Sequence, residues 1–262
     1  MGDRVAGKVC IVTGAAQGIG AAYARRLASE GADVAIVDLT RVDQAKDVVA
    51  DIEKMGRRAL SIEADVTDPE AMQRMAATVV GELGRVDCLV NNAGLMFDQL
   101  TATWEQFLAV NFMGAVNASN AVVPYLWAQR GGSIVNISST AAFPLPLGNL
   151  LAVPDDAPPP SVDPQGYGLT KWMLIFQTRQ MARTLGVRNI RVNAVCPGVT
   201  MSPATKAVVP PAIVDRLVEA AALHTTLQPE DMTGVVLFLA SDDSAKMTGQ
   251  TIINDAGTWF AG

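Results

Sequence analysis

Short apolar runs alternate along the chain with longer segments in which apolar residues recur every three or four positions. The apolar runs predict strands, and the amphipathic segments predict helices. The expected strands cover residues 8–14, 32–38, 58–64, 86–92, 132–138, 190–196 and 250–255. The clearest amphipathic segments are residues 19–31, 41–56 and 68–84. This alternation predicts a parallel sheet with helices on both faces, and the nearly continuous apolar strands agree with cover on both sides.

The pattern indicates a single domain over residues 1–262. Seven strands suit one doubly wound α/β domain, and neither an internal repeat nor a dividing linker interrupts the alternation. Apolar residues make up 50% of the chain, which is enough to build a large core.

Charge and cysteine content exclude several classes of function. The net charge is −6 and no basic block stands out, which argues against nucleic acid or an anionic membrane as the main partner. Cys10, Cys88 and Cys196 lie at wide spacing within apolar runs, a pattern that is neither a disulfide framework nor a metal site. We expect them to be small buried residues, with a reactive thiol as the alternative, and we expect no metal.

The sequence predicts a cytoplasmic protein. The amino-terminal residues contain no apolar segment of the kind found in secretory signals and no myristoylation pattern. No uninterrupted apolar stretch is long enough to span a membrane. With no cysteine framework to explain, a reducing compartment is the default expectation.

The first strand runs directly into a glycine-rich turn, TGAAQGIG, at residues 13–20. A strand, such a turn and a helix start form the context of a phosphate-binding loop. Gly14 permits a tight turn, Gly18 lets backbone approach a pyrophosphate, and Gly20 lets the helix pack against the sheet. The free N–H groups of the helix start favour phosphate. The loop predicts a Rossmann-type dinucleotide-binding domain; a tight turn without a ligand is the alternative.

A carboxylate at the end of the second strand indicates which dinucleotide binds. Asp38 can bind the adenosine ribose hydroxyls and would repel a 2′-phosphate. Gln17 stands where a cation could have met that phosphate, and Arg41 is the only cation nearby. We therefore expect NAD rather than NADP. A helix cap or a solvated strand end is the alternative for Asp38.

Seven motifs carry a resemblance to a known family. In chain order they are TGAAQGIG (13–20), ADVTD (64–68), NNAG (91–94), NFMG (111–114), NISS (136–139), YGLTK (167–171) and CPG (196–198). Together they resemble the classical short-chain dehydrogenases/reductases over residues 8–257. Each motif alone is weak, but seven in order, at the expected strand and helix ends, are highly specific.

The resemblance implies a role for each matched position. Asp65 and Val66 would flank the adenine, residues 197–199 would border the nicotinamide, and Ser202 would lie near its carboxamide. The implied cofactor-binding residues are Gly14, Gln17, Gly18, Ile19, Gly20, Asp38, Leu39, Asp65, Val66, Asn91, Ala93, Gly94, Tyr167, Lys171, Pro197, Gly198, Val199 and Ser202. The implied catalytic residues are Asn111, which would hold a water of the proton relay, Ser139, Tyr167 and Lys171.

The residue types fit oxidation of a secondary alcohol, which requires a base for the hydroxyl proton. The only histidine, His224, lies in a late helical segment and is expected to be structural or exposed. Tyr167 can act instead if its pKa of about 10 is lowered. Lys171 follows four residues later on the same helix face, and its ammonium favours the phenolate. Ser139 would hydrogen-bond the substrate oxygen.

Each member of this set also has an ordinary structural interpretation. A tyrosine and a lysine four residues apart are usually just a helix face, and a serine after a strand is usually a turn or cap. An asparagine in an apolar helix is usually a buried amide with its hydrogen bonds satisfied. Only their occurrence together with the glycine-rich loop favours catalysis.

Residues 144–166 form a proline-rich, acidic insertion between Ser139 and Tyr167. Seven of the 14 prolines lie there, and they exclude a continued strand. The predicted loop is rooted where ligands bind in open α/β sheets. We expect its apolar first half to form a wall of the substrate pocket through Leu145, Leu147 and Leu150. A surface excursion or a subunit contact is the alternative.

A second apolar segment, residues 199–223, corresponds to the mobile substrate lid of the family. Met201 in this lid, together with Leu95 and Met96, would face the pocket. No arginine or lysine is obviously placed to meet a substrate carboxylate or phosphate, and Lys206 is the only nearby candidate. The expected substrate is therefore a neutral, hydrophobic secondary alcohol or ketone, cyclic or aromatic.

Two alternative functions are less favoured by the sequence, and the resemblance also implies an oligomeric state. A reductase of carrier-bound 3-oxoacyl chains would be expected to use NADPH and to have a basic docking patch for the carrier. Asp38 argues against NADPH, and the net charge of −6 argues against the basic patch. A non-catalytic nucleotide-binding regulator is disfavoured by the presence of Ser139, Tyr167 and Lys171. The resemblance implies a homotetramer paired partly through the Tyr167 helix. Ala256 stands where the family often has glycine.

Overall fold

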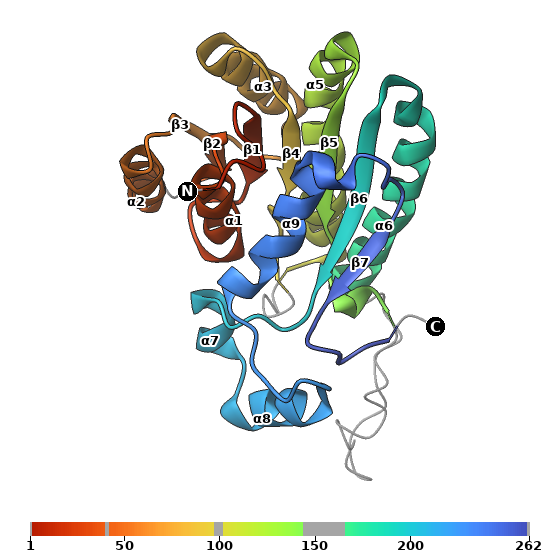
Figure 1. The fold of residues 1–262 in the computed structure, drawn as a ribbon. Helices are drawn as coiled ribbons and strands as arrows, with labels where there is room; N and C mark the ends of the chain where they lie inside the picture. The colour runs from red at the N-terminus through yellow and green to blue at the C-terminus, as the bar shows by residue number, and fades with distance from the viewer. Residues whose placement is uncertain (1, 40–41, 97–101, 144–165, 261–262) are drawn as a thin grey trace.

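The computed structural model describes residues 2–39, 42–96, 102–143 and 166–260. Within them, seven parallel strands form one sheet in the order β3-β2-β1-β4-β5-β6-β7 (Figure 1). The strands are β1 Val9–Thr13, β2 Asp33–Asp38, β3 Ala59–Glu63, β4 Cys88–Asn91, β5 Gly132–Ile137, β6 Ile190–Pro197 and β7 Thr251–Asn254. The predicted single α/β domain with a doubly wound parallel sheet is confirmed.

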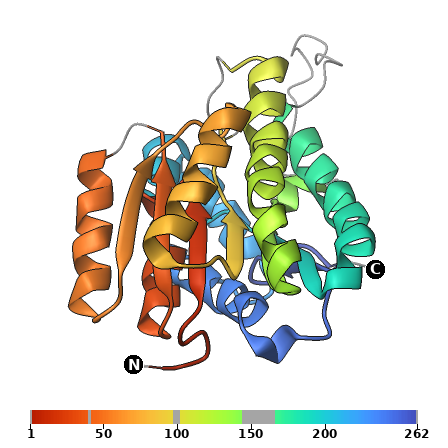
Figure 2. The same cartoon turned by 90° about the horizontal axis from the view of Figure 1, so that it is seen from above.

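Helices cover both faces of this sheet (Figure 2). One face carries α1 (Gly18–Ser29), α2 (Val42–Lys54) and α9 (Thr233–Ala240), and the other carries α3 (Pro69–Leu83), α5 (Gly114–Gln129) and α6 (Gly166–Leu185). Shorter elements are α4 Trp104–Phe107, α7 Pro203–Val208, α8 Pro211–Ala220, the π-helical turn η1 Leu108–Met113, and the 3₁₀ turns η2 Thr140–Ala142, η3 Gly186–Arg188, η4 Pro229–Met232 and η5 Asp242–Ser244.

Local sequence signals explain where helix α3 begins and ends. Asp68 caps it by accepting a hydrogen bond from the Glu70 N–H at 2.8 Å, and Pro69 occupies the first helical position. Gly84 ends the helix with φ +91°, a left-handed conformation that costs glycine little. Because of these signals, the observed helix agrees with the predicted segment 68–84 to within one residue at each end.

Two apolar layers form the core, one on each face of the sheet. Along β1, Cys10 and Val12 enter the layer under α1 and α9, while Val9 and Ile11 enter the layer under α3 and α5. Full burial of a valine or isoleucine side chain in these layers contributes roughly 1.5–3 kcal/mol. Cys10, Cys88 and Cys196 are buried free thiols, as predicted.

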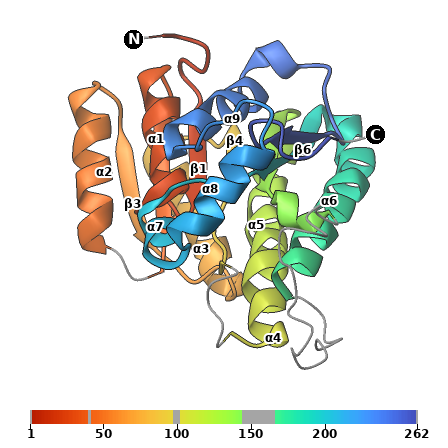
Figure 3. The ribbon, with the colours of Figure 1, turned by 90° about the horizontal axis from the view of Figure 1, so that it is seen from below.

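The sheet changes winding direction between β1 and β4, which are hydrogen-bonded neighbours. Ligands in open α/β folds bind at the carboxyl ends of the strands beside such a switch point. Helices α7 and α8 lie beyond those ends (Figure 1), and Figure 3 views them from that side. The segment expected to be a lid therefore covers the predicted ligand-binding edge.

One helical run, Trp104–Gln129, is long and apolar enough by length and composition to cross a membrane. It joins α4, η1 and α5. Its residues Ala118, Val122 and Leu126 are buried in the layer shared with α3 and the sheet. Core helices commonly have this composition, so the run is weak evidence for a membrane span.

Candidate active site

The glycine-rich loop forms a cradle between β1 and α1. Gly14 has φ +64° and Gly18 has φ +59°, conformations that a side chain would strain. A Cβ at Gly20 would collide with the carbonyl oxygen of Gly14. Helix α1 begins at Gly18, and its N-cap, Gln17, makes no side-chain capping bond. The first-turn N–H groups are thus available to a phosphate.

Residues of the NNAG motif hold this loop in place. The Thr13 hydroxyl oxygen accepts hydrogen bonds from the N–H groups of Asn92 and Ala93, both at 3.0 Å. The Asn92 amide donates in return to the carbonyl oxygens of Thr13 and Gly14, also at 3.0 Å. Sequence reasoning named neither Thr13 nor Asn92 for a role. The signal was present, because both lie inside motifs at adjacent strand ends.

Asp38 is the last residue of β2, and its carboxylate reaches the loop. One oxygen accepts from the Ala16 N–H at 3.1 Å, and the other from the Leu39 N–H at 2.9 Å. The side chain of Leu39 is exposed beside it. The carboxylate is therefore oriented before any ribose binds, and it remains partly accessible.

The next strand end positions Asp65 and Val66. Asp65 accepts from the N–H and the hydroxyl of Thr67, each at 2.8 Å. Asn117 of α5 donates to the Val66 carbonyl oxygen at 3.0 Å, and an added Cβ at Gly114 would lie 2.6 Å from the Val66 side chain. Helix α5 thus fixes the segment that the resemblance places beside the adenine.

The turn that begins at Ser139 packs against the first turn of α6, which carries Tyr167, although the two residues are 28 positions apart in the sequence. Ser139 follows β5 and caps η2, accepting from the Ala141 N–H at 3.1 Å. Tyr167 lies in the first turn of α6, with Phe107 packed edge-on at 6.4 Å between ring centroids. An added Cβ at Gly168 would lie 2.6 Å from the Ala141 carbonyl oxygen. Glycine at this position therefore lets α6 approach the serine turn.

Lys171 is buried one helical turn after Tyr167. Its ammonium donates to the Ile137 carbonyl oxygen at 2.9 Å and lies 5.7 Å from the centroid of the Tyr167 ring. Burial lowers the pKa of Lys171 to about 8. The Ser138 hydroxyl donates to the Lys171 carbonyl oxygen at 2.7 Å, tying α6 to the end of β5.

Asn111 lies in the π-helical turn η1, a local widening that recurs at functional sites. Its amide oxygen accepts from the Leu95 N–H at 2.7 Å, and its amide nitrogen donates to the Leu95 carbonyl oxygen at 3.1 Å. The same nitrogen approaches the Thr170 hydroxyl at 3.5 Å. Asn111 thereby braces the segment after NNAG against α6.

Asn91 and His224 make their hydrogen bonds to other residues than Ser139, Tyr167 and Lys171. The Asn91 amide is buried and donates to Asn136 at 2.8 Å and to Ser119 of α5 at 3.0 Å. Its placement favours a structural role within the sheet. His224 is exposed, with its ring nitrogen 3.3 Å from the Val218 carbonyl oxygen.

The segment after β6 approaches the glycine-rich loop. Ser202 caps α7 by accepting from the Thr205 N–H at 3.2 Å. An added Cβ at Gly18 would lie 3.8 Å from the Ser202 Cβ. Pro197 ends β6, and Gly198 packs so closely on Asp255 that an added Cβ would lie 2.7 Å from the Asp255 Cβ. The segment expected to be a lid therefore starts beside the glycine-rich loop.

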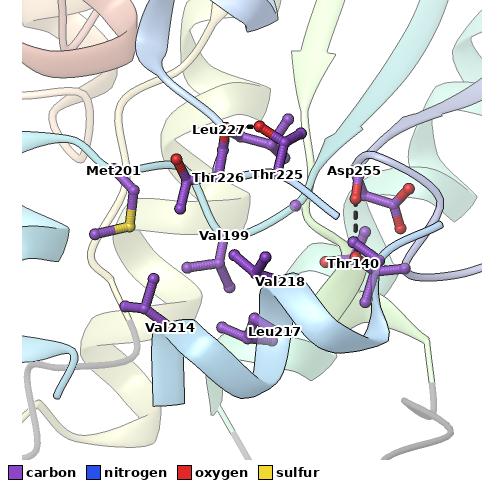
Figure 4. A pocket seen from close by; sticks show the side chains of 13 residues that line it. Thr140, Val199, Met201, Val214, Leu217, Val218, Thr225, Thr226, Leu227 and Asp255 are labelled. Carbon is purple, nitrogen blue, oxygen red and sulfur yellow. Dashed lines mark hydrogen bonds between the residues drawn. The ribbon is translucent and has the colours of Figure 1, made fainter. Parts of the chain in front are cut away.

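A cavity of about 50 Å³ lies under the segment expected to be a lid (Figure 4). Figure 4 shows Val214, Leu217 and Val218 of α8 facing Val199 and Met201. The remaining lining residues are Thr140, Gly198, Ala221, Thr225, Thr226, Leu227, Asp255 and Thr258. Among the lining residues, all within the described parts of the chain, none is cationic.

Of the residues predicted for the substrate pocket, Met201 lines this cavity. Leu95 and Met96 do not line it, although both are partly buried. Leu145, Leu147 and Leu150 lie outside the described residues, as does nearly all of the insertion 144–166. The predicted lid, residues 199–223, includes α8, but its lining residues were not named individually because only the resemblance, and no local motif, marked this segment. Segment 225–227 lies beyond the predicted lid.

A larger hollow of about 460 Å³ lies at the opposite end of the sheet. Its charged lining groups are largely paired: Lys8 with Asp242 at 2.6 Å, and Arg85 with Asp87 at 2.6 Å. It lacks the glycine-rich loop and the Ser139–Tyr167–Lys171 apposition, so it is not the candidate active site.

The fold and this edge define a nucleotide-binding oxidoreductase of the Rossmann class. The profile of the family described as short chain dehydrogenase matches residues 8–149, and that described as enoyl-(acyl carrier protein) reductase matches residues 160–258. The chain belongs to the short-chain dehydrogenase/reductase family, whose members use a nicotinamide cofactor.

Relatives and solved structures agree over nearly the whole chain. A 3-oxoacyl-[acyl-carrier-protein] reductase of Thermotoga maritima is 36% identical, covering 97% of this chain and 98% of its own length. A 7α-hydroxysteroid dehydrogenase complexed with NADH and 7-oxo glycochenodeoxycholic acid has a TM-score of 0.85 at 31% identity, covering 97% of this chain and 95% of that one. A Burkholderia cenocepacia short chain dehydrogenase in complex with NADP has a TM-score of 0.82 at 34% identity, covering 97% and 99%.

The residues present fit a nicotinamide dinucleotide. The absence of a Cβ at Gly14, Gly18 and Gly20 leaves room for backbone to approach a pyrophosphate, and the α1 N–H groups can meet its charge. Asp38 presents a carboxylate at the end of β2 that could accept hydrogen bonds from a ribose. The Lys171 ammonium is a cationic hydrogen-bond donor that lies beside Gly94: a Cβ added at Gly94 would lie 3.5 Å from it.

Proposed function

We propose that this protein is an NAD(H)-dependent oxidoreductase that interconverts a neutral, hydrophobic secondary alcohol, cyclic or aromatic, and its ketone. The observation that carries the proposal is the packing of the Ser139 turn against α6 at Tyr167 and Lys171, directly beside the NNAG segment. This arrangement brings a hydroxyl donor, a phenol and a buried cation to the edge where the cofactor loop lies.

The proposed residues share the handling of one proton. Ser139 hydrogen-bonds the substrate oxygen and orients the carbon that exchanges hydride. Tyr167 accepts the alcohol proton during oxidation and returns it during reduction. Lys171 stabilises the phenolate by its charge, and Asn111 steadies the water-bearing segment that the resemblance implies. The nicotinamide, when bound, accepts or donates the hydride.

The proposal names NAD because Asp38 presents a carboxylate, already hydrogen-bonded to Ala16, at the ribose position. A 2′-phosphate placed there would meet like charge. Calorimetric titration with NADH and NADPH tests this. We expect NADH to bind at least about tenfold more tightly, and Asp38→Ser to narrow the difference. Tighter binding of NADPH by the unmodified protein would contradict the assignment.

The substrate class follows from the lining of the lid cavity. Apolar side chains of α8 face Val199 and Met201, and the described lining residues offer no cation to a carboxylate or phosphate. At about 50 Å³ the cavity is far smaller than a typical ligand pocket of roughly 300–1,000 Å³. Binding a ring-sized substrate therefore requires α8 to move outward.

Reduction of a carrier-bound 3-oxoacyl chain is the second candidate function. It is favoured by the likeness to the Thermotoga maritima reductase. Initial rates with an acyl-carrier-protein thioester and with free cyclic ketones separate the two. A specificity constant at least about 100-fold higher for the carrier-bound substrate would establish this second function in place of the first.

We further propose a cytoplasmic homotetramer. On α6, Trp172 and Phe176 stack at 6.2 Å between ring centroids and are 50% and 52% exposed. Leu169 of the same helix is also exposed. Exposed aromatic residues grouped on one helix are typical of subunit contacts. The three free thiols agree with a reducing compartment.

A further inference from the structure

Residues 255–259, which follow β7, form a compact hook. Both oxygens of the Asp255 carboxylate are used: one accepts from the Gly257 N–H at 2.9 Å and the other from the Trp259 N–H at 2.7 Å. The Thr258 hydroxyl donates to the Asp255 carbonyl oxygen at 2.8 Å. Asp255 is 5% exposed and forms no ion pair with any described residue. The buried carboxylate therefore organises the backbone of residues 257–259.

The hook contacts the turn that carries Ser139. The Trp259 ring stacks on Phe143 with 4.4 Å between centroids and 19° between planes. Phe143 ends η2, and its N–H donates to the Thr140 carbonyl oxygen at 3.1 Å. Thr140 in turn lines the lid cavity together with Asp255 (Figure 4). The aromatic pair therefore braces the serine turn from its carboxyl side.

The hook also fastens the lid. The N–H of Ala222 donates to the Gly257 carbonyl oxygen at 3.2 Å, and that of Leu223 to the Ala256 carbonyl oxygen at 3.0 Å. An added Cβ at Gly257 would lie 2.8 Å from the Ala222 side chain, so the two segments touch. These contacts hold the residues that follow the carboxyl end of α8.

We propose that residues 255–259 act as a positioning element, in which the Asp255 carboxylate holds Trp259 against Phe143 to fix the Ser139 turn and fastens the carboxyl end of the lid. The element links the lid to the proton-handling side chains and makes Trp259 a positioning residue. Its kinetic consequence rests on the proposed function, but its structural consequence does not.

Amide hydrogen exchange tests the element without any substrate. In Trp259→Ala, we expect the Ala142 and Phe143 amides to exchange at least about tenfold faster, while those of Ala222 and Leu223 change less than about threefold. Asp255→Ala should accelerate both pairs. Val187→Ala, which trims a 73% exposed side chain outside the hook, should accelerate neither. Unchanged exchange at Ala142 and Phe143 in Trp259→Ala would overturn the proposal.

Kinetics supply the second measurement. For a substrate that the unmodified protein turns over, we expect Trp259→Ala to lower kcat/KM about tenfold or more with NADH affinity unchanged, and Trp259→Phe to restore most of it. A loss that Trp259→Phe does not restore, or an equal loss in NADH affinity, would indicate general destabilisation and overturn the positioning role. Turnover by no protein in the series would contradict the proposed function, while hydrogen exchange would still decide the hook.

Discussion

Lys171 places a charge where the surroundings disfavour it. Burial lowers its pKa from 10.5 to about 8, so the folded protein binds this proton less readily than the unfolded chain. Below pH 8 the buried charge therefore lowers the free energy of unfolding by an amount on the order of 3 kcal/mol. This penalty disappears as the pH rises from about 8 to 10.5, because the lysine becomes neutral first in the folded protein and then in the unfolded chain. The side chain costs stability at neutral pH, as functional groups often do.

Replacing Lys171 by methionine tests that cost. We expect Lys171→Met to raise the free energy of unfolding by roughly 1–3 kcal/mol at pH 7. The advantage should shrink as the pH rises from about 8 to 10.5, because the unmodified lysine becomes neutral in the folded state. Denaturant melts across this pH range measure it. A difference that does not vary with pH would contradict the burial argument.

At the residue scale, motif spacing predicted most of the apposed side chains but not their supports. Tyr167 and Lys171 could be placed on one helix face from their spacing alone. Asn92 could not be distinguished from Asn91, because only the strand pairing shows which amide reaches the Gly14 carbonyl oxygen. Asp255 escaped notice because its partners are formed by the chain folding back on itself.

At the scale of elements, the approach of α6 to the serine turn depends on Gly168. A Cβ there would lie 2.6 Å from the Ala141 carbonyl oxygen, a backbone atom that cannot swing away. We expect Gly168→Ala to lower kcat at least about tenfold, because a shift of about 1 Å in a positioning group is costly. The matched control is Gly81→Ala in α3, where an added Cβ meets nothing within 4 Å.

The control variant is also expected to change the stability of the protein. Gly81→Ala should raise the free energy of unfolding by about 0.5–1 kcal/mol through helix propensity and leave the rate unchanged. Equal activity in the two variants would show that α6 does not need this close approach.

The turn after β7 stores strain at Ala256. This residue has φ +59°, a left-handed conformation that costs a side chain about 1 kcal/mol or more. We expect Ala256→Gly to raise the free energy of unfolding by about 0.5–1 kcal/mol, as measured by denaturant melts. A loss of stability would mean that the buried Ala256 methyl group contributes more through packing than it costs in strain.

Element boundaries were largely predictable because they depend on local signals. Strand and helix ends fall within a few residues of the predicted ranges, as at Asp68 and Gly84 for α3. The widening at η1 was not predictable from periodicity, since Leu108–Met113 continues the same apolar pattern as α5. The contact between Trp259 and Phe143 joins segments more than a hundred residues apart, beyond the reach of local patterns.

At the scale of the whole molecule, the exposed α6 aromatics predict assembly. We expect the unmodified protein to sediment as a tetramer and Trp172→Asp to shift it to smaller species, because a buried unpaired charge destabilises an interface. Sedimentation velocity at several concentrations measures this. Val187→Asp, at a residue 73% exposed just beyond α6, is the matched control. A tetramer unaffected by Trp172→Asp would place the contact elsewhere.

The most direct test of the central claim is to follow the absorbance of the reduced cofactor, NADH or NADPH. The purified protein is incubated with NAD⁺ or NADP⁺ and with a panel of cyclic, aromatic and linear secondary alcohols. The account predicts turnover with NAD⁺ and neutral hydrophobic alcohols. It also predicts that Tyr167→Phe lowers turnover roughly 10²- to 10⁴-fold while NADH still binds. Turnover that survives Tyr167→Phe, or that occurs only with NADP⁺, would contradict it.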